Sequence, residues 1–274
     1  MKKILLTFLS LLLLQTCTFA FETSIKFIQV TDTHFSINNP YPGEVLNALV
    51  KDINKQKGVS FVVFTGDNID QAKPEQLIGF MKIVRHLHIP YYIVMGNHDA
   101  FKSGGLSKER YTEIVKEYKP LWFHKTWNYS FHKKGYTFLV VDGAKEVIPG
   151  ASGYFREKTL TWVDKQLTKN RRHPVIILQH FPLVESPEFG AGRLKTHRVY
   201  EAEKYLSILE KHDNVLAIIS GHYHKNAESM QNGIYHINTP SLLSDPPSYK
   251  IIDIVSKRGF SPIIYTQLKE VELK

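Results

Sequence analysis

Cysteine is almost absent from this sequence, which contains a single one, Cys17, among 274 residues. A fold held together by disulfide bonds is therefore excluded. Because no thiolate is available beyond residue 17, any metal ion would need nitrogen and oxygen ligands. Repeats and low-complexity tracts are absent as well, and the shares of hydrophobic (43%) and charged (22%) residues are those of an ordinary globular protein. The length suits one large α/β domain or two small ones.

Long apolar runs are missing too, except near the N-terminus. Residues 4–14 are almost unbrokenly apolar and follow Lys2 and Lys3, but the run is too short to span a bilayer comfortably. The small residues on either side of Phe19 fit a signal-peptidase site. We therefore predict a signal peptide over residues 1–20 and a periplasmic or secreted protein.

Two alternatives to a cleaved signal peptide stay open. One is an uncleaved N-terminal anchor. The other is a lipoprotein anchored through Cys17, although Gln15 and Thr16 are not the small residues favoured before a lipidated cysteine.

Negative charge is scarce relative to positive charge, and the formal net charge is +9. This excess favours anionic partners. The basic residues are scattered, however, and the densest runs, Lys133-Lys134 and residues 169–173, do not interleave with aromatic residues. Solvated faces would also explain these runs, so we expect no obligate nucleic-acid partner. Phosphates and a membrane surface are other anionic partners that fit the excess, and the oligomeric state is left open.

Hydrophobic patterning predicts strands and helices that alternate in the first hundred residues, which is typical of a parallel sheet with crossover helices. Strands are expected at residues 25–31, 61–65, 91–95, 127–132, 136–141, 175–178, 215–219, 234–238, 248–255 and 262–268. Helices are expected at residues 44–56, 74–88, 107–118, 160–167 and 199–211, with a long loop over 182–198. No linker divides the chain, so we predict one α/β domain over residues 21–274, made of two packed mixed sheets flanked by helices.

Directly after each of five predicted strands, the sequence has side chains that can bind a metal ion. They are Asp32 with His34, Asp67, Asn97 with His98 and Asp99, His180, and His222 with His224. Ligands at the carboxyl ends of parallel strands converge on one crevice. Each piece alone has an ordinary structural explanation as a turn or a core histidine, but the full ordered set predicts a metal centre.

The spacing of these residues has physical reasons. In Asp32-Thr33-His34 the first and third side chains of an extended chain point to one side, and His222-Tyr223-His224 repeats the spacing. A glycine precedes three of the ligand groups, at Gly66, Gly96 and Gly221, where it permits a sharp turn and a close approach. Mixed imidazole, carboxylate and amide ligands suit divalent manganese, iron or zinc.

With these motifs, the chain resembles the calcineurin-like metallophosphoesterase superfamily, and within it the branch of class III cyclic-nucleotide-phosphodiesterase-type enzymes. The resemblance covers roughly residues 25 to 240 and is specific for the superfamily rather than for a substrate. It implies the four-layer metallophosphoesterase sandwich, with helices outside two packed sheets.

The resemblance also implies roles for the matching residues. Asp32, His34 and His224 would hold one divalent ion, and Asn97, His180 and His222 a second, with Asp67 bridging both. His98 would face the ester as proton donor or phosphate clamp, and Asp99 would orient it. Two such ions stabilise the attacking and leaving oxygens of a displacement.

Two departures narrow the branch. Purple acid phosphatases carry a tyrosine three residues after the bridging aspartate, where this chain has Asp70. Protein serine/threonine phosphatases carry an arginine-glycine pair, where this chain has Gln71-Ala72. Substrate contacts are expected weakly from Arg193 and Lys195 in the basic loop and from Tyr223, for which packing is the alternative.

The sequence therefore predicts an exported dinuclear-metal phosphodiesterase for a cyclic nucleotide or a glycerophosphodiester. The alternatives are a phosphomonoesterase or nucleotidase that scavenges phosphate, and a non-catalytic binding protein on the same scaffold.

Overall fold

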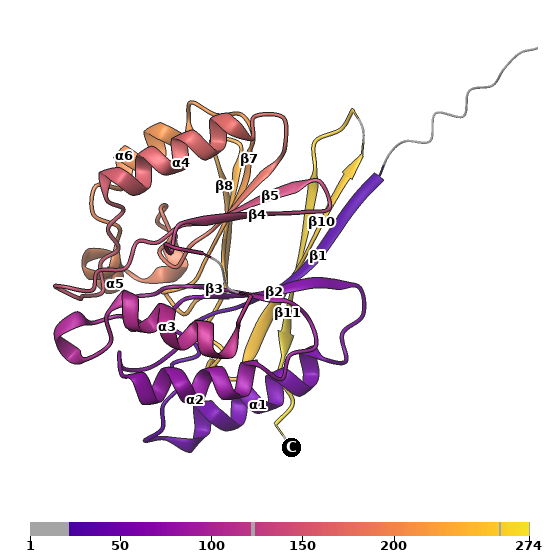
Figure 1. Cartoon of the computed structure of the whole chain (residues 1–274). Helices are drawn as coiled ribbons and strands as arrows, with labels where there is room; N and C mark the ends of the chain where they lie inside the picture. Colours follow the sequence, from indigo (N-terminus) through magenta and orange to yellow (C-terminus); the bar gives the residue numbers. More distant parts are fainter. Residues whose placement is uncertain (1–21, 122–123, 258, 274) are drawn as a thin grey trace, which may run out of the picture.

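Two mixed β-sheets face one another, and helices cover their outer faces, in the computed structural model of the chain (Figure 1). The structure describes residues 22–121, 124–257 and 259–273. The predicted α/β fold class, two packed mixed sheets flanked by helices, is confirmed. The predicted signal peptide and Cys17 lie outside the described residues. Within the described ranges, no helix is long and apolar enough to cross a membrane.

The first sheet has the strand order β11-β10-β1-β2-β3. β1, β2 and β3 are parallel, whereas β10 runs antiparallel to β1 and β11 antiparallel to β10. Its strands are β1 (Glu22–Val30), β2 (Val59–Thr65), β3 (Tyr91–Val94), β10 (Ser248–Lys257) and β11 (Ile263–Glu270).

The second sheet has the order β4-β5-β6-β7-β9-β8. Its four inner strands are parallel, and an antiparallel strand closes each edge. Its strands are β4 (Tyr129–Lys133), β5 (Tyr136–Val140), β6 (Val175–Leu178), β7 (Val215–Ser220), β8 (Ala227–Gln231) and β9 (Ile234–Asn238).

The helices begin where the sequence supplies caps. Asn39 accepts a hydrogen bond from the Tyr41 amide at the start of α1, and Ser107 accepts one from the Arg110 amide at the start of α3. Pro74 occupies the first turn of α2, as predicted. The helices are α1 (Pro40–Ile53), α2 (Pro74–Val84), α3 (Lys108–Tyr118), α4 (Glu157–Lys169), α5 (Ala191–His197) and α6 (Ala202–Leu209), with short 3₁₀ turns η1 (Lys102–Gly104) and η2 (Pro187–Phe189).

Residues 182–231 differ most from the sequence prediction. The predicted loop over 182–198 contains η2 and α5, and the helix predicted from residue 199 begins at Ala202. β8 was not predicted, because four of its five residues are exposed and it has no apolar alternation. β8 exists because the neighbouring strand β9 offers it backbone partners at the sheet edge.

The core is aromatic where the two sheets meet. The Phe27 ring of β1 stacks on Phe61 of β2 with centroids 4.9 Å apart, and both make edge contacts with Phe138 of β5. All three side chains are fully buried. This contact fixes the two sheets against each other, so the loops at the carboxyl ends of their parallel strands have a defined relation.

Candidate metal centre

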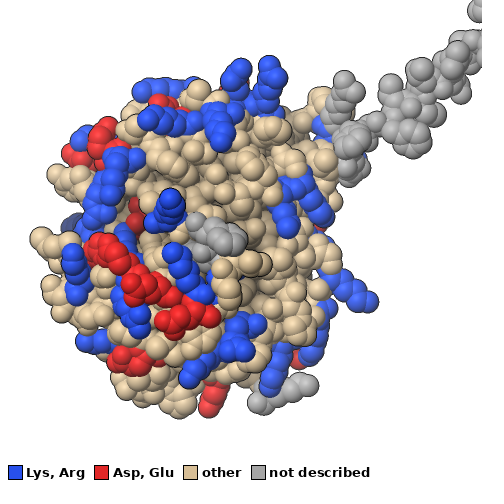
Figure 2. All heavy atoms as spheres, viewed as in Figure 1, with Lys and Arg blue, Asp and Glu red and all other residues tan. Residues whose placement is uncertain are grey.

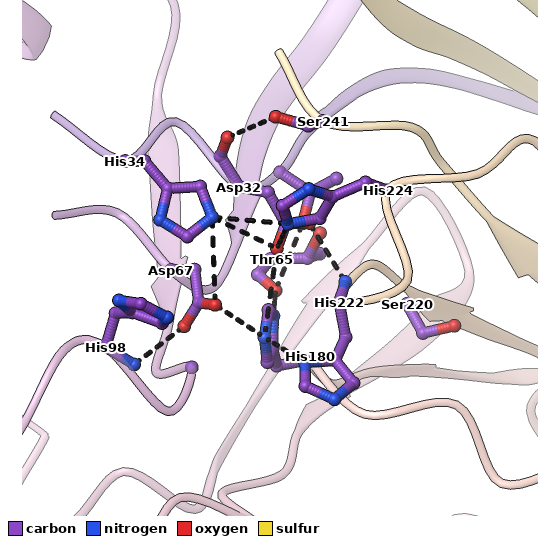
Figure 3. A network of polar contacts seen from close by, with 12 residues as sticks. Asp32, His34, Thr65, Asp67, His98, His180, Ser220, His222, His224 and Ser241 are labelled. Carbon is purple, nitrogen blue, oxygen red and sulfur yellow. Dashed lines mark hydrogen bonds and ion pairs between the residues drawn. The ribbon is translucent and has the colours of Figure 1, made fainter. Parts of the chain in front are cut away.

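The metal-capable residues lie at one edge of both sheets. β1, β2, β6 and β7 each end two residues before a predicted ligand, at Asp32, Asp67, His180 and His222 respectively. Side chains from both sheets therefore meet between the carboxyl ends of their parallel strands (Figure 3).

The first ligand group is Asp32, His34 and His224. The Nε2 atoms of His34 and His224 are 3.2 Å apart, and His224 Nε2 is 3.2 Å from Asp32 Oδ1. His34 Nε2 is also 3.9 Å from Asp32 Oδ1. One nitrogen or oxygen atom from each residue thus faces a common point.

The second ligand group is Asp67, His180 and His222. Asp67 Oδ2 is 3.3 Å from His180 Nε2, and His180 Nε2 is 3.2 Å from His222 Nδ1. Asp67 Oδ2 is also 4.0 Å from His34 Nε2 of the first group. The Asp67 carboxylate therefore lies between the two groups, where a bridging ligand would be needed.

The ligand loops reach this point through an unusual backbone. Asp32, His34, His222 and His224 all have positive φ, of 51°, 39°, 73° and 56°, and Asp67 has φ 49°. Left-handed conformations of non-glycine residues carry strain and cluster at functional sites. Each paired set therefore converges through two left-handed residues, and the extended chain predicted from the spacing is wrong.

Two of the glycines that precede ligands are needed for close approach. A Cβ atom on Gly221 would lie 2.5 Å from Asp32 Oδ2, and one on Gly96 would collide with the Asp67 carboxylate. Neither glycine has a positive φ. The requirement at these two positions is therefore space beside a ligand carboxylate.

A buried polar network lies next to the ligand loops, and no sequence pattern predicts it. Gln29 donates from Nε2 to Thr65 Oγ1 (2.9 Å) and to the Ser220 carbonyl (2.8 Å), and its Oε1 accepts from Thr239 Oγ1 (2.6 Å). Gln29 is fully buried. It ties the ends of β1, β2, β7 and β9 together, directly beneath the ligands.

Each buried ligand histidine has one ring nitrogen occupied by a carbonyl. His180 Nδ1 donates to the Thr65 carbonyl (2.8 Å), and His222 Nε2 donates to the His197 carbonyl (3.0 Å). These bonds fix the tautomers, so His180 presents Nε2 and His222 presents Nδ1 to the centre. Such a second hydrogen bond is typical of metal-bound histidine.

The Asp32 carboxylate accepts hydrogen bonds on one of its two oxygens. Asp32 Oδ2 accepts from Thr31 Oγ1 (2.7 Å) and from the His222 amide (2.9 Å). Asp32 Oδ1 and the Asn97 amide oxygen are buried and have no hydrogen-bond partner within the described ranges. Because an unpaired buried oxygen is costly, these two atoms fit a site for a cation, and the donor set fits a divalent one.

The pKa values within the centre also indicate a site for positive charge. Burial lowers the pKa of His180, but the carboxylates of Asp67 and Asp32 outweigh burial and raise it to about 9. Burial and the neighbouring His180 lower the pKa of His222 to about 3. Burial raises the pKa of Asp32, but His180 and His224 outweigh burial and hold it well below its usual range. The anionic pocket thus attracts positive charge, as a proton or as a metal ion.

His98 lies beside the first group. Its ring is 4.8 Å from that of His34 between centroids, at 89°. Its Nδ1 donates to the Asp70 carbonyl (2.6 Å), and its amide donates to Asp67 Oδ1 (2.8 Å). Burial lowers the pKa of His98, but Asp67, the Asp70 carbonyl and Asp99 together raise it.

Asp99 holds the loop rather than the ring of His98, which corrects the predicted orienting contact. Its carboxylate accepts hydrogen bonds from the amides of Asn68 (2.9 Å), Ile69 (3.2 Å) and Gly96 (2.7 Å), and from Asn68 Nδ2 (2.9 Å). The ring itself is bonded to Asp70, as described above. Asp99 therefore joins the loops after β2 and β3, and burial with Asp67 nearby raises its pKa to about 7.

The residues predicted to contact substrate do not lie among the ligand groups. Tyr223 is buried and stacks on Phe189 of η2, with centroids 4.1 Å apart and planes at 2°. Packing, the alternative we considered, therefore describes Tyr223 here. Lys195 is exposed on α5, and no hydrogen bond or ion pair joins it to a ligand candidate in the described part of the chain. The side chain of Arg193 lies outside what the structure describes.

Comparison with known proteins places these residues in a family context. The family model described as calcineurin-like phosphoesterase matches residues 25–226. The probable glycerophosphodiester phosphodiesterase GpdQ of Arcobacter nitrofigilis is 27% identical over 233 residues, covering 82% of this chain and 79% of that protein. The 3',5'-cyclic adenosine monophosphate phosphodiesterase CpdA of Escherichia coli is 23% identical over 243 residues, covering 83% and 80%.

Phosphatases are among the relatives too. The human protein named serine/threonine-protein phosphatase CPPED1 is 30% identical over 232 residues, covering 76% of this chain and 69% of that one. Gln71-Ala72 therefore does not by itself separate the chain from proteins of that name. The crystal structure of a dimetal phosphatase from Danio rerio has the same fold, with a TM-score of 0.64, 18% identity, and coverage of 88% of this chain and 98% of that chain.

Proposed function

Because the chain belongs to the calcineurin-like phosphoesterase family and is a metal-dependent phosphoric ester hydrolase, we propose that it binds two divalent metal ions and hydrolyses a phosphodiester. The observation that carries the proposal is the place of the Asp67 carboxylate, which belongs to one candidate group with His180 and His222 and to another with His34 and His98. Asp32, His34, Asp67 and His224 would hold one ion, and Asp67, Asn97, His180 and His222 the other. The mixed nitrogen and oxygen donors suit manganese, iron or zinc.

The ions and the protein would divide the chemistry. When bound, two divalent ions supply polarisation of the phosphoryl oxygens and acidification of a water molecule. The chain itself positions the ester through His98. Since Nδ1 of His98 is bonded to the Asp70 carbonyl, Nε2 is the atom that would donate to a phosphate oxygen or to the leaving group. The raised pKa of His98 favours the protonated, donating form.

A diester is favoured over a monoester as the substrate. Relatives named as a glycerophosphodiester phosphodiesterase and a cyclic-nucleotide phosphodiesterase each align with more than four-fifths of the chain. The phosphatase names of other relatives favour a second candidate, a phosphomonoesterase or nucleotidase.

The decisive experiment is hydrolysis of bis-p-nitrophenyl phosphate and p-nitrophenyl phosphate, with Mn²⁺ added or removed by a chelator. Metal-dependent preference for the diester supports the proposal, and cyclic nucleotides and glycerophosphodiesters would then be screened. Preference for the monoester selects the second candidate. Two bound ions without turnover of any of these substrates would favour a non-catalytic binding protein.

The role of His98 has its own test. His98→Ala should lower turnover by about 10²- to 10⁴-fold, the usual contribution of general acid–base catalysis, while both metal ions stay bound. His124→Ala serves as a matched control, because His124 lies outside the centre and stacks on Tyr129. Unchanged turnover in His98→Ala would remove the proposed role.

We further propose that the protein is exported, on the basis of the basic start, apolar run and small residues within residues 1–20. Mass spectrometry of the mature N-terminus distinguishes the forms. A start at Phe21 supports free export, a diacylated Cys17 supports a lipid anchor, and an intact Met1 in exported material supports an uncleaved anchor. An intact chain in the cytoplasm alone would contradict export.

A further inference from the structure

The end of the molecule opposite the metal centre gathers turns from both sheets. The β4–β5 turn and the α4–β6 turn lie together, because Thr137 pairs with Val175 in parallel register. The β4–β5 turn also approaches the end of β10, where Tyr136 and Ser256 share a hydrogen bond of 2.5 Å. The two turns precede the parallel strands β5 and β6, and Ser256 pairs with Thr23 at the start of β1, whereas the metal ligands follow the carboxyl ends of parallel strands.

Strand β8 and the β10–β11 turn lie at the same end. A groove there runs between Arg171 and Arg172 of the α4–β6 turn, Met230 of β8, and Ser261 and Pro262 of the β10–β11 turn. One acidic residue also lines this groove, Asp213. We call the resulting surface the basal face, defined by Lys133, Lys134, Arg171, Arg172, Met230, Phe260 and Ile263.

The basal face combines positive charge with exposed apolar side chains. Lys134, Arg171 and Arg172 are exposed, and Lys133 is half-buried. The exposed fractions are 77% for Phe260, 58% for Met230 and 52% for Ile263. Single exposed apolar residues are ordinary, but a cluster beside basic residues is typical of surfaces that enter the interface of an anionic bilayer.

The place where the described chain begins favours a membrane as the partner. β1 begins at Glu22, which pairs with Lys257, the last residue of β10, beside the β10–β11 turn (Figure 1). The apolar run over residues 4–14 and the basic Lys2 and Lys3 precede this point in the sequence. In the two anchored forms left open above, this segment would bring a bilayer to the end of the molecule where β1 begins, which is the basal end.

We propose that the basal face docks on an anionic membrane surface, with Phe260 and Ile263 entering the interface and the basic turns contacting lipid headgroups. Figure 2 shows Lys and Arg side chains along this edge of the molecule, around the point where the described chain begins. Since the metal ligands lie at the other ends of the same strands, the docked protein holds its metal centre away from the bilayer. Substrate then reaches the centre from the aqueous side.

The test is partition of the full chain onto vesicles of phosphatidylcholine alone or with 30% phosphatidylglycerol, measured by flotation. The variant Lys133→Gln, Lys134→Gln, Arg171→Gln, Arg172→Gln should reduce the anionic-to-neutral partition ratio at least about tenfold, because each basic residue near an anionic surface contributes about fivefold to binding. A matched control replaces four exposed lysines on the outer helices: Lys82, Lys116, Lys158 and Lys165. It should keep the wild-type ratio.

The N-terminal segment does not confound this comparison, because all variants share it. Equal ratios in wild type and the basal variant would overturn the proposal, and so would an equal loss in the control. Binding of a DNA oligonucleotide that depends on the same residues, without vesicle binding, would assign the face to nucleic acid instead. Turnover of a soluble diester and the melting temperature should be unchanged, since the replaced residues lie outside the metal centre.

A second measurement tests the orientation. Phe260→Trp should show fluorescence quenching by brominated lipids above the wild-type level, whereas Ile148→Trp should not. Ile148 is a fair control because it is 78% exposed, close to the value for Phe260. Greater quenching at residue 148 than at residue 260 would show that another face contacts the bilayer and would overturn the proposal.

Discussion

The two ligand groups of the metal centre have similar atoms in different surroundings. In the first group the side chains of His34 and His224 are 15% and 34% exposed. In the second group His180 is fully buried and His222 is 4% exposed. The first group therefore opens toward solvent, and the second is enclosed between the sheets.

The groups also differ in charge. In the proposed ligand sets the first ion would have two carboxylates, those of Asp32 and Asp67, whereas the second would have the Asp67 carboxylate and the neutral amide of Asn97. Asp32 Oδ1 also lies 3.9 Å from His180 Nε2, so its charge reaches the second group at a longer distance. A divalent ion in the first group gains more coulombic attraction. It also loses less hydration, because the group is more open. The two proposed ions would therefore not be equivalent, and the ion in the first group should bind more tightly.

The largest effect on turnover is expected from Asp67→Asn, which changes both ligand groups. Removing the carboxylate that both groups share should lower turnover about a thousandfold or more, beyond the 10- to 100-fold typical of losing an outer-shell partner. Metal analysis by mass spectrometry should show that both ions are weakened. Asp70→Asn is the control, three residues along the same loop. Loss of only one ion in Asp67→Asn would show that the carboxylate is not shared.

Changing the charge of one ligand group at a time should show how much charge determines each metal affinity. Asn97→Asp adds a carboxylate to the second group and should tighten its ion about tenfold, because affinity rises with ligand charge. Asp32→Asn should weaken the first ion by a similar factor. Calorimetric titration with Mn²⁺ measures both. An unchanged second affinity in Asn97→Asp would place residue 97 outside the ligand set.

Acid should weaken the second ion more than the first. His180 has a pKa of about 9, raised by Asp67 and Asp32 against burial, and it must lose its proton to bind a metal. The affinity is therefore complete above about pH 9 and falls about tenfold for each unit below it. Titration at pH 8, 7 and 6 in buffers of different ionisation enthalpy would count the released proton. A pH-independent affinity would contradict this assignment.

The smallest effect on turnover is expected from the network beneath both groups. Gln29→Leu leaves its buried partners unpaired and should cost about 1–3 kcal/mol of unfolding free energy. Turnover should fall only a few-fold, since no ligand is removed. Gln267→Leu, at an exposed position of β11, is the control. Denaturant unfolding with and without Mn²⁺ measures the stability of both variants. A wild-type unfolding free energy for Gln29→Leu would show that the network does not stabilise the protein.

Much of the fold could be predicted because its strands are apolar. β2 and β6 read as unbroken buried runs, and each leads directly into a ligand. β8 could not be predicted, because its polar sequence is set by an edge position that depends on β9. α5 could not be predicted either, because Gly190 before it and Gly192 within it are typical of a loop.

The ligands could be predicted from their order, but the reason they converge could not. A motif gives residue identity, whereas the left-handed backbone at Asp32 and His224 is set by tertiary packing. The partners of Asp99 were missed for a similar reason, since its bonds reach Asn68 in another loop. The metal number and identity, the substrate and the location remain predictions.

The hydrogen bond from the His222 amide to Asp32 joins residues 190 positions apart. The centre therefore cannot form from any N-terminal fragment that ends before β7, however well β1 to β3 have paired. Loop closure over such a distance is slow compared with helix formation. During synthesis and folding, the ability to bind metal would appear late and all at once. The rate of metal uptake should therefore report the final step of folding, which follows the formation of secondary structure.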